Sequence, residues 1–428
     1  MAQLKVLICG AGIAGNALAF WLSKLGYDVT VIERFPTLRV TGLQIDLRGY
    51  GIEVMKRMGI EKSFRHKSVQ EQGLEFVDSS GRRRAYFPTK TTGKGLQSFS
   101  TDYEIMRGDL CQILYDETKD RVKYIFGTSI ENYTGDDNSV HVVFSDGKTE
   151  QFDLLVGADG QGSRTRRMMF GPVIEDSVTF LGVYIAYFTI PQQIKQGEGY
   201  VGSVYIATQQ RYVFTRRHKP DAIQVYLACQ QEDGPLAKTR RGDIEEESEA
   251  MISIFRGAGW QTDRILKALR EETDDFYCER LSVVKLPSWS SGRVTLLGDA
   301  AFCPSATTGM GTSSSLVGAY VLAGEIMKHC GHAQGNAEQG RKPSKANLTD
   351  ALKAYESKFR PFMDQVQEGI AEGSSFWNRI PSSSLGIAIL YIFMSVVAFL
   401  RLNDLGKWVL REDVKGWKLP EYKTMMQV

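Results

Sequence analysis

Three glycines and one glutamate near the start of the chain have the residue types and the spacing of a dinucleotide-binding site. Gly10, Gly12 and Gly15 form the pattern G-x-G-x-x-G, and Glu33 follows them. In such a site the first glycine makes a tight turn, the second lets a pyrophosphate approach the backbone, and the third lets a helix pack closely on a strand. A carboxylate at Glu33 can accept hydrogen bonds from an adenosine ribose. This set predicts that a dinucleotide binds here.

The elements that must position these residues are a strand, a helix and a second strand. Leu4–Cys9 is apolar and too short for a helix, which predicts a buried parallel strand. Apolar residues then recur at helical spacing until Gly26, and Asp28–Ile32 predicts the second strand. The N-terminus of such a helix offers free N–H groups to a phosphate. The other residues of this stretch assigned to the predicted site are Ala11, Ile13, Ala14 and Arg34.

Length and composition limit the alternatives. A chain of 428 residues exceeds one ordinary domain, so we expect two packed lobes. The net charge of +2 gives no reason to expect nucleic acid, and the short basic run Arg82–Arg84 predicts a solvated surface. The chain enters its first strand without a leader-like segment, which favours an intracellular, cytoplasmic location. Six scattered cysteines predict reduced, buried thiols, and no metal site is expected.

Two further buried strands also end in turns of glycine and aspartate. Leu154–Val156 leads to Asp159-Gly160, and the stretch GRVTLLGD ends at Gly298-Asp299. A Gly/Ser/Thr-rich loop and a helix follow the third turn. A nicotinamide-dependent dehydrogenase normally requires only the first of these turns, so a different dinucleotide is indicated.

With these three turns, the chain resembles the class A flavin-dependent monooxygenases, the family of para-hydroxybenzoate hydroxylase and the tetracycline-inactivating monooxygenases. The resemblance implies an α/β fold: a Rossmann-like FAD-binding domain interleaved with a mostly antiparallel β-sheet substrate domain, plus C-terminal helices. We expect FAD-binding parts at residues 1–175, with inserted hairpins, and 286–330. The substrate-binding sheet is expected at 176–285 and the C-terminal helical region at 348–428.

The resemblance also implies roles for the motif residues. The glycine fingerprint and its acid would bind the ADP part of FAD, and Arg107 in IMRGDL would contact the cofactor as well. Asp159 would help hold the region between FAD and the reducing nicotinamide, and the Asp299 carboxylate would bond the ribityl chain. The loop TTGMGTS would present backbone N–H groups to the flavin pyrimidine end. The residues assigned to the site from this loop are Gly309, Gly311 and Thr312.

Gln44, Asp46 and Arg48 alternate with apolar residues, so their side chains could point the same way. Two interpretations stay open from the residues themselves: a solvated strand face, or a polar edge that faces a ligand. The resemblance implies that this stretch runs beside the isoalloxazine ring.

The chain departs from the family pattern around the third turn. Phe302 stands where the family commonly has the histidine of G-D-A-A-H, and the usual Pro-Pro region reads Cys303-Pro304-Ser305. Ser313 and Gly318 stand where an asparagine and an aspartate are often seen. Because the core glycines and Asp299 remain, we still expect FAD, with altered surroundings of the ring.

The region from about Thr179 to Gln230 is aromatic, β-branched and partly alternating, as in an antiparallel sheet with one covered face. Such a sheet could form an aromatic lid over the flavin, or its aromatic residues could simply face the core. The residues considered for a substrate pocket are Tyr184, Tyr187, Tyr205, Tyr212, Phe214 and Tyr226. Polar neighbours, mostly expected at the surface, are Arg211, Arg216, Arg217 and His218. No catalytic residue is assigned.

The function that the resemblance implies is FAD-dependent monooxygenation. NADPH or NADH reduces FAD, O2 forms a flavin C4a-hydroperoxide, and one oxygen atom enters the substrate by hydroxylation or epoxidation. A hydrophobic, aromatic or polycyclic small molecule such as a secondary metabolite is the expected substrate. No second nicotinamide fingerprint occurs, which fits transient binding of the reductant. A flavin-dependent oxidase or reductase acting on a similar substrate is the alternative.

One late segment, Leu385–Leu400, is apolar apart from a single serine. It is shorter than the roughly 20 residues that a bilayer-spanning helix needs. A helix buried against its own protein or a partner is favoured, and membrane association through residues 385–400 is the alternative. The sequence does not specify the oligomeric state.

Overall fold

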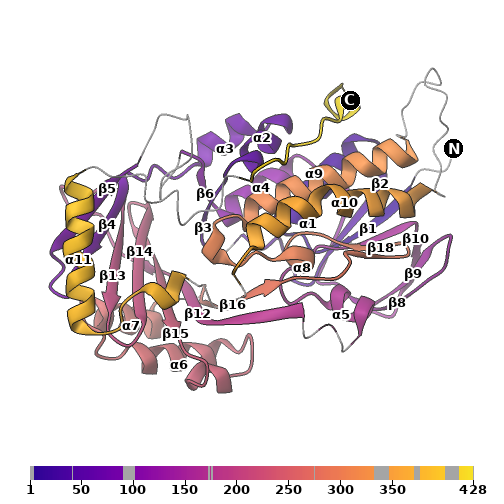
Figure 1. Ribbon diagram of the computed structural model, residues 1–428. Helices are drawn as coiled ribbons and strands as arrows, with labels where there is room; N and C mark the ends of the chain where they lie inside the picture. The colour runs from indigo at the N-terminus through magenta and orange to yellow at the C-terminus, as the bar shows by residue number, and fades with distance from the viewer. Residues whose placement is uncertain are drawn as a thin grey trace.

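The computed structural model describes residues 4–40, 42–89, 102–171, 174, 177–273, 275–331, 347–370, 376–400 and 414–427. Two sheet-based lobes lie side by side, one built on a parallel sheet and the other on a larger, mostly antiparallel sheet (Figure 1). The α/β class and the two kinds of sheet predicted from the sequence are confirmed.

The first lobe contains a six-stranded sheet in the order β17-β18-β11-β1-β2-β7, in which only the β17–β18 pair is antiparallel. Its strands are β17 (Ser290–Ser291), β18 (Val294–Leu296), β11 (Leu154–Gly157), β1 (Lys5–Cys9), β2 (Asp28–Glu33) and β7 (Lys123–Phe126). The central strands β1, β11 and β18 are largely apolar along both faces because both faces are covered. Val6 and Ile8 enter a helix-covered core, whereas Leu7 and Cys9 pack beneath a second, small sheet.

Helices cover one face of this sheet, and the small sheet covers the other (Figure 1). The covering helices are α1 (Ile13–Lys24), α9 (Gly311–Cys330) and α10 (Leu348–Gln367). The strands of the small antiparallel sheet are β8 (Ile130–Gly135), β9 (Val140–Phe144) and β10 (Thr149–Phe152). Shorter helices at the margins are α2 (Tyr50–Arg57), α3 (Glu61–Lys67), α4 (Arg107–Asp116), α5 (Arg164–Phe170), α8 (Asp299–Phe302), η3 (Ala306–Thr308) and α13 (Lys423–Gln427).

The second lobe contains a seven-stranded sheet in the order β16-β12-β15-β14-β13-β4-β5. Its strands are β16 (Tyr277–Val284), β12 (Val178–Pro191), β15 (Ala222–Gln230), β14 (Arg211–Lys219), β13 (Val201–Ala207), β4 (Gly73–Val77) and β5 (Arg83–Pro88). The β4–β5 hairpin, predicted as an insertion, adds to this sheet through a parallel pairing of β4 with β13. The late strands and the early hairpin therefore form one surface.

Further helices lie against the second sheet. Helices α6 (Ile244–Phe255) and α7 (Thr262–Glu271) bury one face, and α11 (Ser384–Phe399) packs at the β5 end (Figure 1). The short elements η2 (Pro235–Lys238) and η6 (Phe376–Arg379) lie in the same lobe. A two-stranded ribbon, β3 (Gln44–Asp46) with β6 (Glu104–Met106), connects the two lobes. All six cysteines are buried and free of disulfides, as predicted.

Candidate cofactor-binding and active site

Two glycines of the first turn are required by the packing of the protein itself. Gly10 has a φ of +110°, and a Cβ built there would lie 2.5 Å from the carbonyl oxygen of Ala158. A Cβ on Gly15 would lie 2.0 Å from the carbonyl oxygen of Gly10. Any side chain at either position would therefore displace backbone that belongs to the fold.

Gly12 differs from its two neighbours. Its φ of −77° suits any residue, and a Cβ there would have the Nη2 atom of Arg107 as its nearest neighbour, at 3.6 Å. Gly12 is also the N-cap of α1 and has no side-chain cap, so the first N–H groups of the helix face this open space. The space that a Cβ would fill fits a pyrophosphate at the helix N-terminus.

The three turns meet at the carboxyl edge of the parallel strands. Ala158, which Gly10 contacts, directly precedes the turn at Asp159. Gly298 has a φ of +64°, and a Cβ there would lie 2.8 Å from the Cβ of Ala14 in the first turn of α1. This edge is where open α/β sheets bind ligands.

Glu33 is held at the end of β2, next to the glycine turn. Its Oε2 atom accepts a hydrogen bond from the N–H of Ala11 at 2.9 Å, and its Oε1 atom accepts one from the N–H of Phe35 at 3.1 Å. Ile13 begins α1. Arg34 is exposed, with its guanidinium 5.0 Å from the centre of the Phe35 ring. Glu33 therefore lies within the cradle, whereas Arg34 stands at its solvent side.

Asp159 stabilises the second turn by hydrogen bonds. Its carboxylate accepts hydrogen bonds from the Ser163 hydroxyl at 2.5 Å, the N–H of Arg164 at 2.8 Å and the N–H of Thr165 at 3.0 Å. These contacts satisfy the N-terminus of α5. Arg166, which the sequence did not single out, is buried and donates to the carbonyl of Ala300 at 2.9 Å. It ties the second turn to the third, and its place in a basic run gave no signal of this.

Asp299 and Glu279 lie close enough for their charges to interact. Burial raises the pKa of Asp299, and the nearby Arg107 and Arg166 partly oppose this. Burial, followed by the charge of Asp299, raises the pKa of Glu279 to about 7. Tyr187 donates its hydroxyl to Glu279 Oε2 at 3.2 Å. Glu279 was not identified from sequence because it occupies an ordinary position in β16.

Glu279→Gln is expected to change the pH dependence of stability. Because the folded-state pKa is raised, folding favours the protonated carboxyl, and this stability is lost as pH rises from the ordinary pKa of 4.5 through about 7. Urea unfolding at pH below and above this window should show a loss of about 1–3 kcal/mol in the wild type that the variant lacks. The exposed Glu117→Gln is the control. An identical pH dependence in the wild type and Glu279→Gln would contradict the assignment.

The loop before α9 has an unusual backbone. Ser305 adopts φ +66° and ψ 150°, a conformation close to glycine-only territory, and its buried hydroxyl has no hydrogen-bond partner. Gly309 is left-handed, with φ +65°, and a Cβ on Gly311 would lie 4.0 Å from Asp299 Oδ1. Gly311 and Thr312 form the first turn of α9, whose N-terminus has no side-chain cap. Strain and unused polar groups of this kind are typical of functional loops.

The departures from the family pattern in this region compensate one another. Phe302 is fully buried, with its ring centre 4.8 Å from that of Trp289 and 5.2 Å from that of Phe359. A Cβ on Gly318 would lie 3.0 Å from the Phe302 ring. The absence of a side chain at Gly318 therefore makes room for a phenylalanine where the family commonly has histidine.

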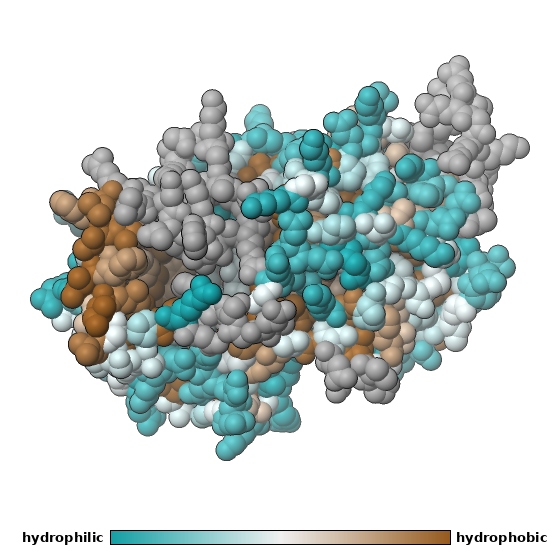
Figure 2. Space-filling model, in the orientation of Figure 1, coloured by the Kyte–Doolittle hydropathy of each residue, from teal (hydrophilic) through white to brown (hydrophobic). Residues whose placement is uncertain are grey.

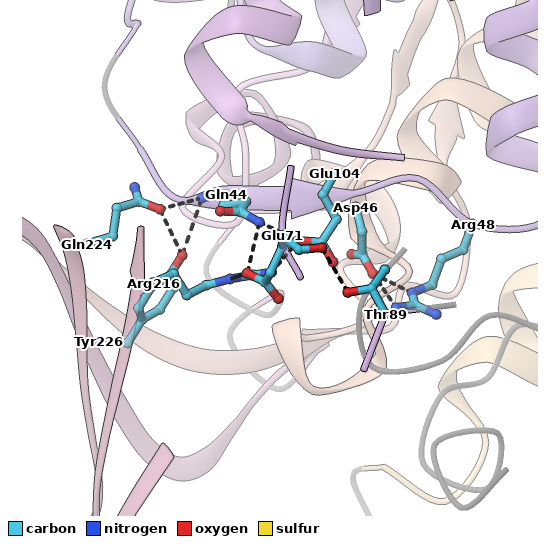
Figure 3. A network of polar contacts seen from close by, with 9 residues as sticks. All are labelled: Gln44, Asp46, Arg48, Glu71, Thr89, Glu104, Arg216, Gln224 and Tyr226. Atoms are coloured by element: carbon cyan, nitrogen blue, oxygen red, sulfur yellow. Dashed lines mark hydrogen bonds and ion pairs between the residues drawn. The ribbon is translucent and has the colours of Figure 1, made fainter. Parts of the chain in front are cut away.

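The stretch that carries Gln44, Asp46 and Arg48 is a polar edge and not a solvated strand face (Figure 3). Gln44 and Arg48 are buried, and Arg48 forms an ion pair with Asp46. The N–H of Arg48 donates to Ser313 Oγ at 2.8 Å, which joins this edge to the first turn of α9. Ser313 therefore has a positioning role at the place where the family often has asparagine.

Gln44 also donates hydrogen bonds within a buried cluster of charged residues (Figure 3). This cluster, hereafter the charge cluster, consists of Glu71, Glu104 and Arg216, together with the neutral Gln44. The Arg216 guanidinium pairs with Glu71 at 2.7 Å and also with Glu104. The side chains of both glutamates are at most 2% exposed. These residues come from distant parts of the chain, so no local pattern could predict their meeting.

The expectation that the polar residues of β14 lie mostly at the surface is wrong for all three of its arginines. Arg211 and Arg217 are buried and donate to backbone carbonyls, and Arg216 belongs to the charge cluster. Their long side chains fill space between the sheet and its surroundings while their charged ends find acceptors.

The six aromatic candidates do not line one pocket. Tyr184 and Tyr205 face the core beneath α6 and α7, and the Tyr205 hydroxyl donates to the carbonyl of Ala258 at 2.8 Å. The other four share the opposite face of the sheet with Leu43 and Trp377: they are Tyr187, Tyr212, Phe214 and Tyr226. Because side chains alternate between the faces of a strand, the sequence could not assign a face to each.

The aromatic face meets the predicted ring-binding edge directly. The backbone N–H of Gln44 donates to the Tyr226 hydroxyl at 3.3 Å. Gly42 and Leu43 line a cavity of about 20 Å³ together with Tyr187 and Tyr226. The interface between the lobes therefore combines an aromatic surface, a polar edge and the Asp299 turn.

The fold and the open phosphate cradle define the class of protein, a flavoprotein that binds FAD. Residues 3–351 match the family model described as an FAD binding domain. The chain belongs to the class A FAD-dependent monooxygenases.

Individual relatives agree with this membership. The chain is 50% identical over 430 residues to FAD-dependent monooxygenase asL4 of Sarocladium schorii, covering all of both chains. It is 44% identical over 437 residues to flavin-dependent monooxygenase eupH of Phoma sp, covering 99% of this chain and 98% of the relative. The crystal structure of tetracycline destructase Tet(51) superposes with a TM-score of 0.75 at 29% identity, covering 99% of this chain and 100% of that one.

Proposed function

We propose that this monooxygenase uses NADPH or NADH to reduce FAD and inserts one atom of O2 into a hydrophobic, aromatic or polycyclic small molecule of the secondary-metabolite type. The aromatic face beside Gln44 and Asp299 carries this proposal. Its aromatic rings suit a flat substrate, and the polar edge at Gln44 adjoins them. A structural relative, Tet(51), is a tetracycline destructase.

The residues of the three turns would hold FAD in this proposal. Gly12 leaves room for the pyrophosphate, and Glu33 and Arg107 lie next to this glycine turn. Asp299 lies close to Gly311, in the first turn of α9. When bound, the flavin supplies the redox chemistry with O2, and the protein supplies position, electrostatics and exclusion of water. The fit of the cradle does not depend on any one substrate.

The protein's own residues would orient the substrate and handle protons. Tyr226 and Phe214 present their rings at 5.1 Å centre to centre on the aromatic face. Tyr187 connects this face to Glu279, whose pKa of about 7 suits proton exchange near neutrality. A phenolic or indolic substrate on this face could exchange a proton through that pair.

Oxygen-18 labelling tests the proposed reaction. The purified protein, incubated with NADPH or NADH, a panel of polycyclic aromatic compounds and ¹⁸O2, should give a product with one labelled oxygen atom. The substrate should also stimulate oxidation of the nicotinamide. Labelling from H₂¹⁸O with unlabelled gas is the control. A product without label from ¹⁸O2 would indicate an oxidase or a reductase and would overturn the proposal.

A further inference from the structure

One buried side-chain oxygen at the edge of the aromatic face has no hydrogen-bond partner. Gln44 is 2% exposed, and its Oε1 atom finds no donor among the residues that the structure describes. Buried acceptors in folded proteins are almost always paired, because an unpaired one loses its bonds to water without replacement. The Gln44 oxygen therefore indicates that a bound molecule supplies a donor at this point.

The charge cluster determines which end of the Gln44 amide is presented to that molecule. The Nε2 atom donates to Glu71 Oε2 at 3.4 Å and also to Glu104 Oε2, and Arg216 binds the same two oxygen atoms (Figure 3). A carboxylate oxygen accepts hydrogen bonds and cannot donate one. Rotation of the amide by half a turn would place Oε1 against two carboxylates. The Nε2 atom must therefore face the glutamates, and Oε1 must face away from them.

The backbone of Gln44 is fixed to the aromatic face. Its N–H lies 3.3 Å from both the Gln224 Oε1 atom and the Tyr226 hydroxyl oxygen (Figure 3). Gln224 Nε2 in turn donates to the carbonyl of Gly42 at 3.2 Å. Gln224, Tyr226 and Gly42 all line the cavity of about 20 Å³. Gln44 therefore lies at the boundary between the aromatic rings and the charged residues.

Helix α11 leaves an unpartnered surface of a different kind. Its inner side packs on the sheet through Ile387 and Tyr391, whereas Ile389 and Phe393 belong to the hydrophobic residues that gather on its outer side (Figure 2). No helix among the described parts of the chain is long and apolar enough to cross a membrane. An apolar surface alone does not identify an occupant. The Gln44 oxygen is more specific, because it requires a hydrogen-bond donor.

We propose that Gln44 selects substrates that carry an O–H or N–H group, by accepting a hydrogen bond from that group at Oε1. Glu71 and Glu104 are positioning residues, because they hold the amide with its oxygen toward the bound molecule. The proposal rests on the proposed function, which takes the aromatic face as the substrate surface. Phenols and indoles satisfy both requirements, with a flat apolar ring and one donor at its edge.

Binding of a matched pair of probes to the oxidised, FAD-loaded protein tests this proposal. The probes 2-naphthol and 2-methoxynaphthalene share a flat ring system, and only the first carries a donor. Titrations followed by the change in flavin absorbance should show that the wild type binds 2-naphthol at least about tenfold more tightly. Gln44→Met, which keeps the length of the side chain and removes its oxygen, should bind both probes within about twofold of each other.

Glu104→Gln distinguishes a positioning role from a purely structural one. An amide in place of the carboxylate can pair with either orientation of the Gln44 amide, so Nε2 becomes available to the bound molecule. Affinity for 2-methoxynaphthalene, whose oxygen is an acceptor, should therefore rise about threefold or more, while affinity for 2-naphthol falls. A parallel loss for both probes would show that Glu104 only supports the fold.

Gln367→Met is the matched control, since Gln367 is 6% exposed and its Nε2 donates to two backbone carbonyls at 2.8 and 3.0 Å. This variant should keep the preference for 2-naphthol. Tyr212→Phe should keep it as well, although the buried Tyr212 hydroxyl also lacks a partner among the described residues. Loss of the preference in Tyr212→Phe and not in Gln44→Met would place the selecting group at Tyr212 and contradict the proposal.

Two further results would overturn the proposal. The first is a wild type that does not bind 2-naphthol more tightly than its methyl ether. The second concerns the cofactor, which also carries O–H and N–H groups. Gln44→Met apoprotein should bind FAD like the wild type, and a loss of FAD affinity of about tenfold would show that the donor belongs to FAD. None of these titrations uses a reductant or O2, so their outcome is independent of the oxygen-18 result on the proposed reaction.

Discussion

Gly12→Val is expected to abolish tight FAD binding and leave the apoprotein folded. The added side chain enters the open space in front of α1, where the nearest atom of the protein is 3.6 Å from the Cβ position. Valine tolerates the extended backbone of Gly12, so the cost to the fold should be at most about 1 kcal/mol. FAD affinity should fall at least about a hundredfold, which corresponds to about 2.8 kcal/mol. Flavin fluorescence titration of apoprotein measures the loss.

Gly15→Val provides the comparison within the same motif. Its Cβ would lie 2.0 Å from the carbonyl oxygen of Gly10, so the strand and the helix must separate. This variant should lose both FAD and thermal stability, whereas Gly12→Val should keep the melting temperature of the apoprotein. Full flavin retention in Gly12→Val would show that the pyrophosphate does not lie at this turn.

Arg216→Met is expected to produce the largest loss of stability of any single substitution in the charge cluster. It removes the arginine from Glu71 and Glu104, whose side chains are almost inaccessible to water. Loss of one partner from a buried ion pair costs about 3–5 kcal/mol. The deficit should grow as pH rises. Without the arginine, the two buried carboxyl groups resist ionisation in the folded variant, whereas they ionise freely in the unfolded chain. Urea denaturation at several pH values measures it.

Arg240→Met is the matched control, since Arg240 also pairs with two carboxylates but is 79% exposed. Its loss should cost less than about 1 kcal/mol. Adding Glu71→Gln and Glu104→Gln to Arg216→Met should restore part of the stability, because the buried charges are then gone. Equal losses for Arg216→Met and Arg240→Met would show that the charge cluster is not buried in solution.

Much of the first lobe could be predicted from the sequence because its determinants are local. A tight turn requires glycine at Gly10, and close packing of helix on strand requires it at Gly15. Strands covered on both faces must be apolar throughout, so β1, β2 and β11 were recognisable as short apolar runs. Each Gly/Asp turn follows its strand directly. These features gave the α/β fold and the FAD cradle.

Tertiary structure decided the features that depend on contacts between distant segments. The contact of Glu71, Glu104 and Arg216 follows from the pairing of strands far apart in sequence. Local sequence patterns carry no signal of such a contact. The face of the sheet on which Tyr205 or Tyr226 lies depends on register, since one residue of shift exchanges the faces.

Helix α11 shows the same division. Its uniform apolar sequence predicted a helix and could not say which side would be covered, because both sides are equally apolar. Only the packing of Tyr391 on the sheet determines which residues remain outside. The sequence alone thus determined the cradle, where backbone geometry restricts residue type at each position. The assembled fold determined the charge cluster, the aromatic face and the exposed side of α11, because these depend on where residues lie in space.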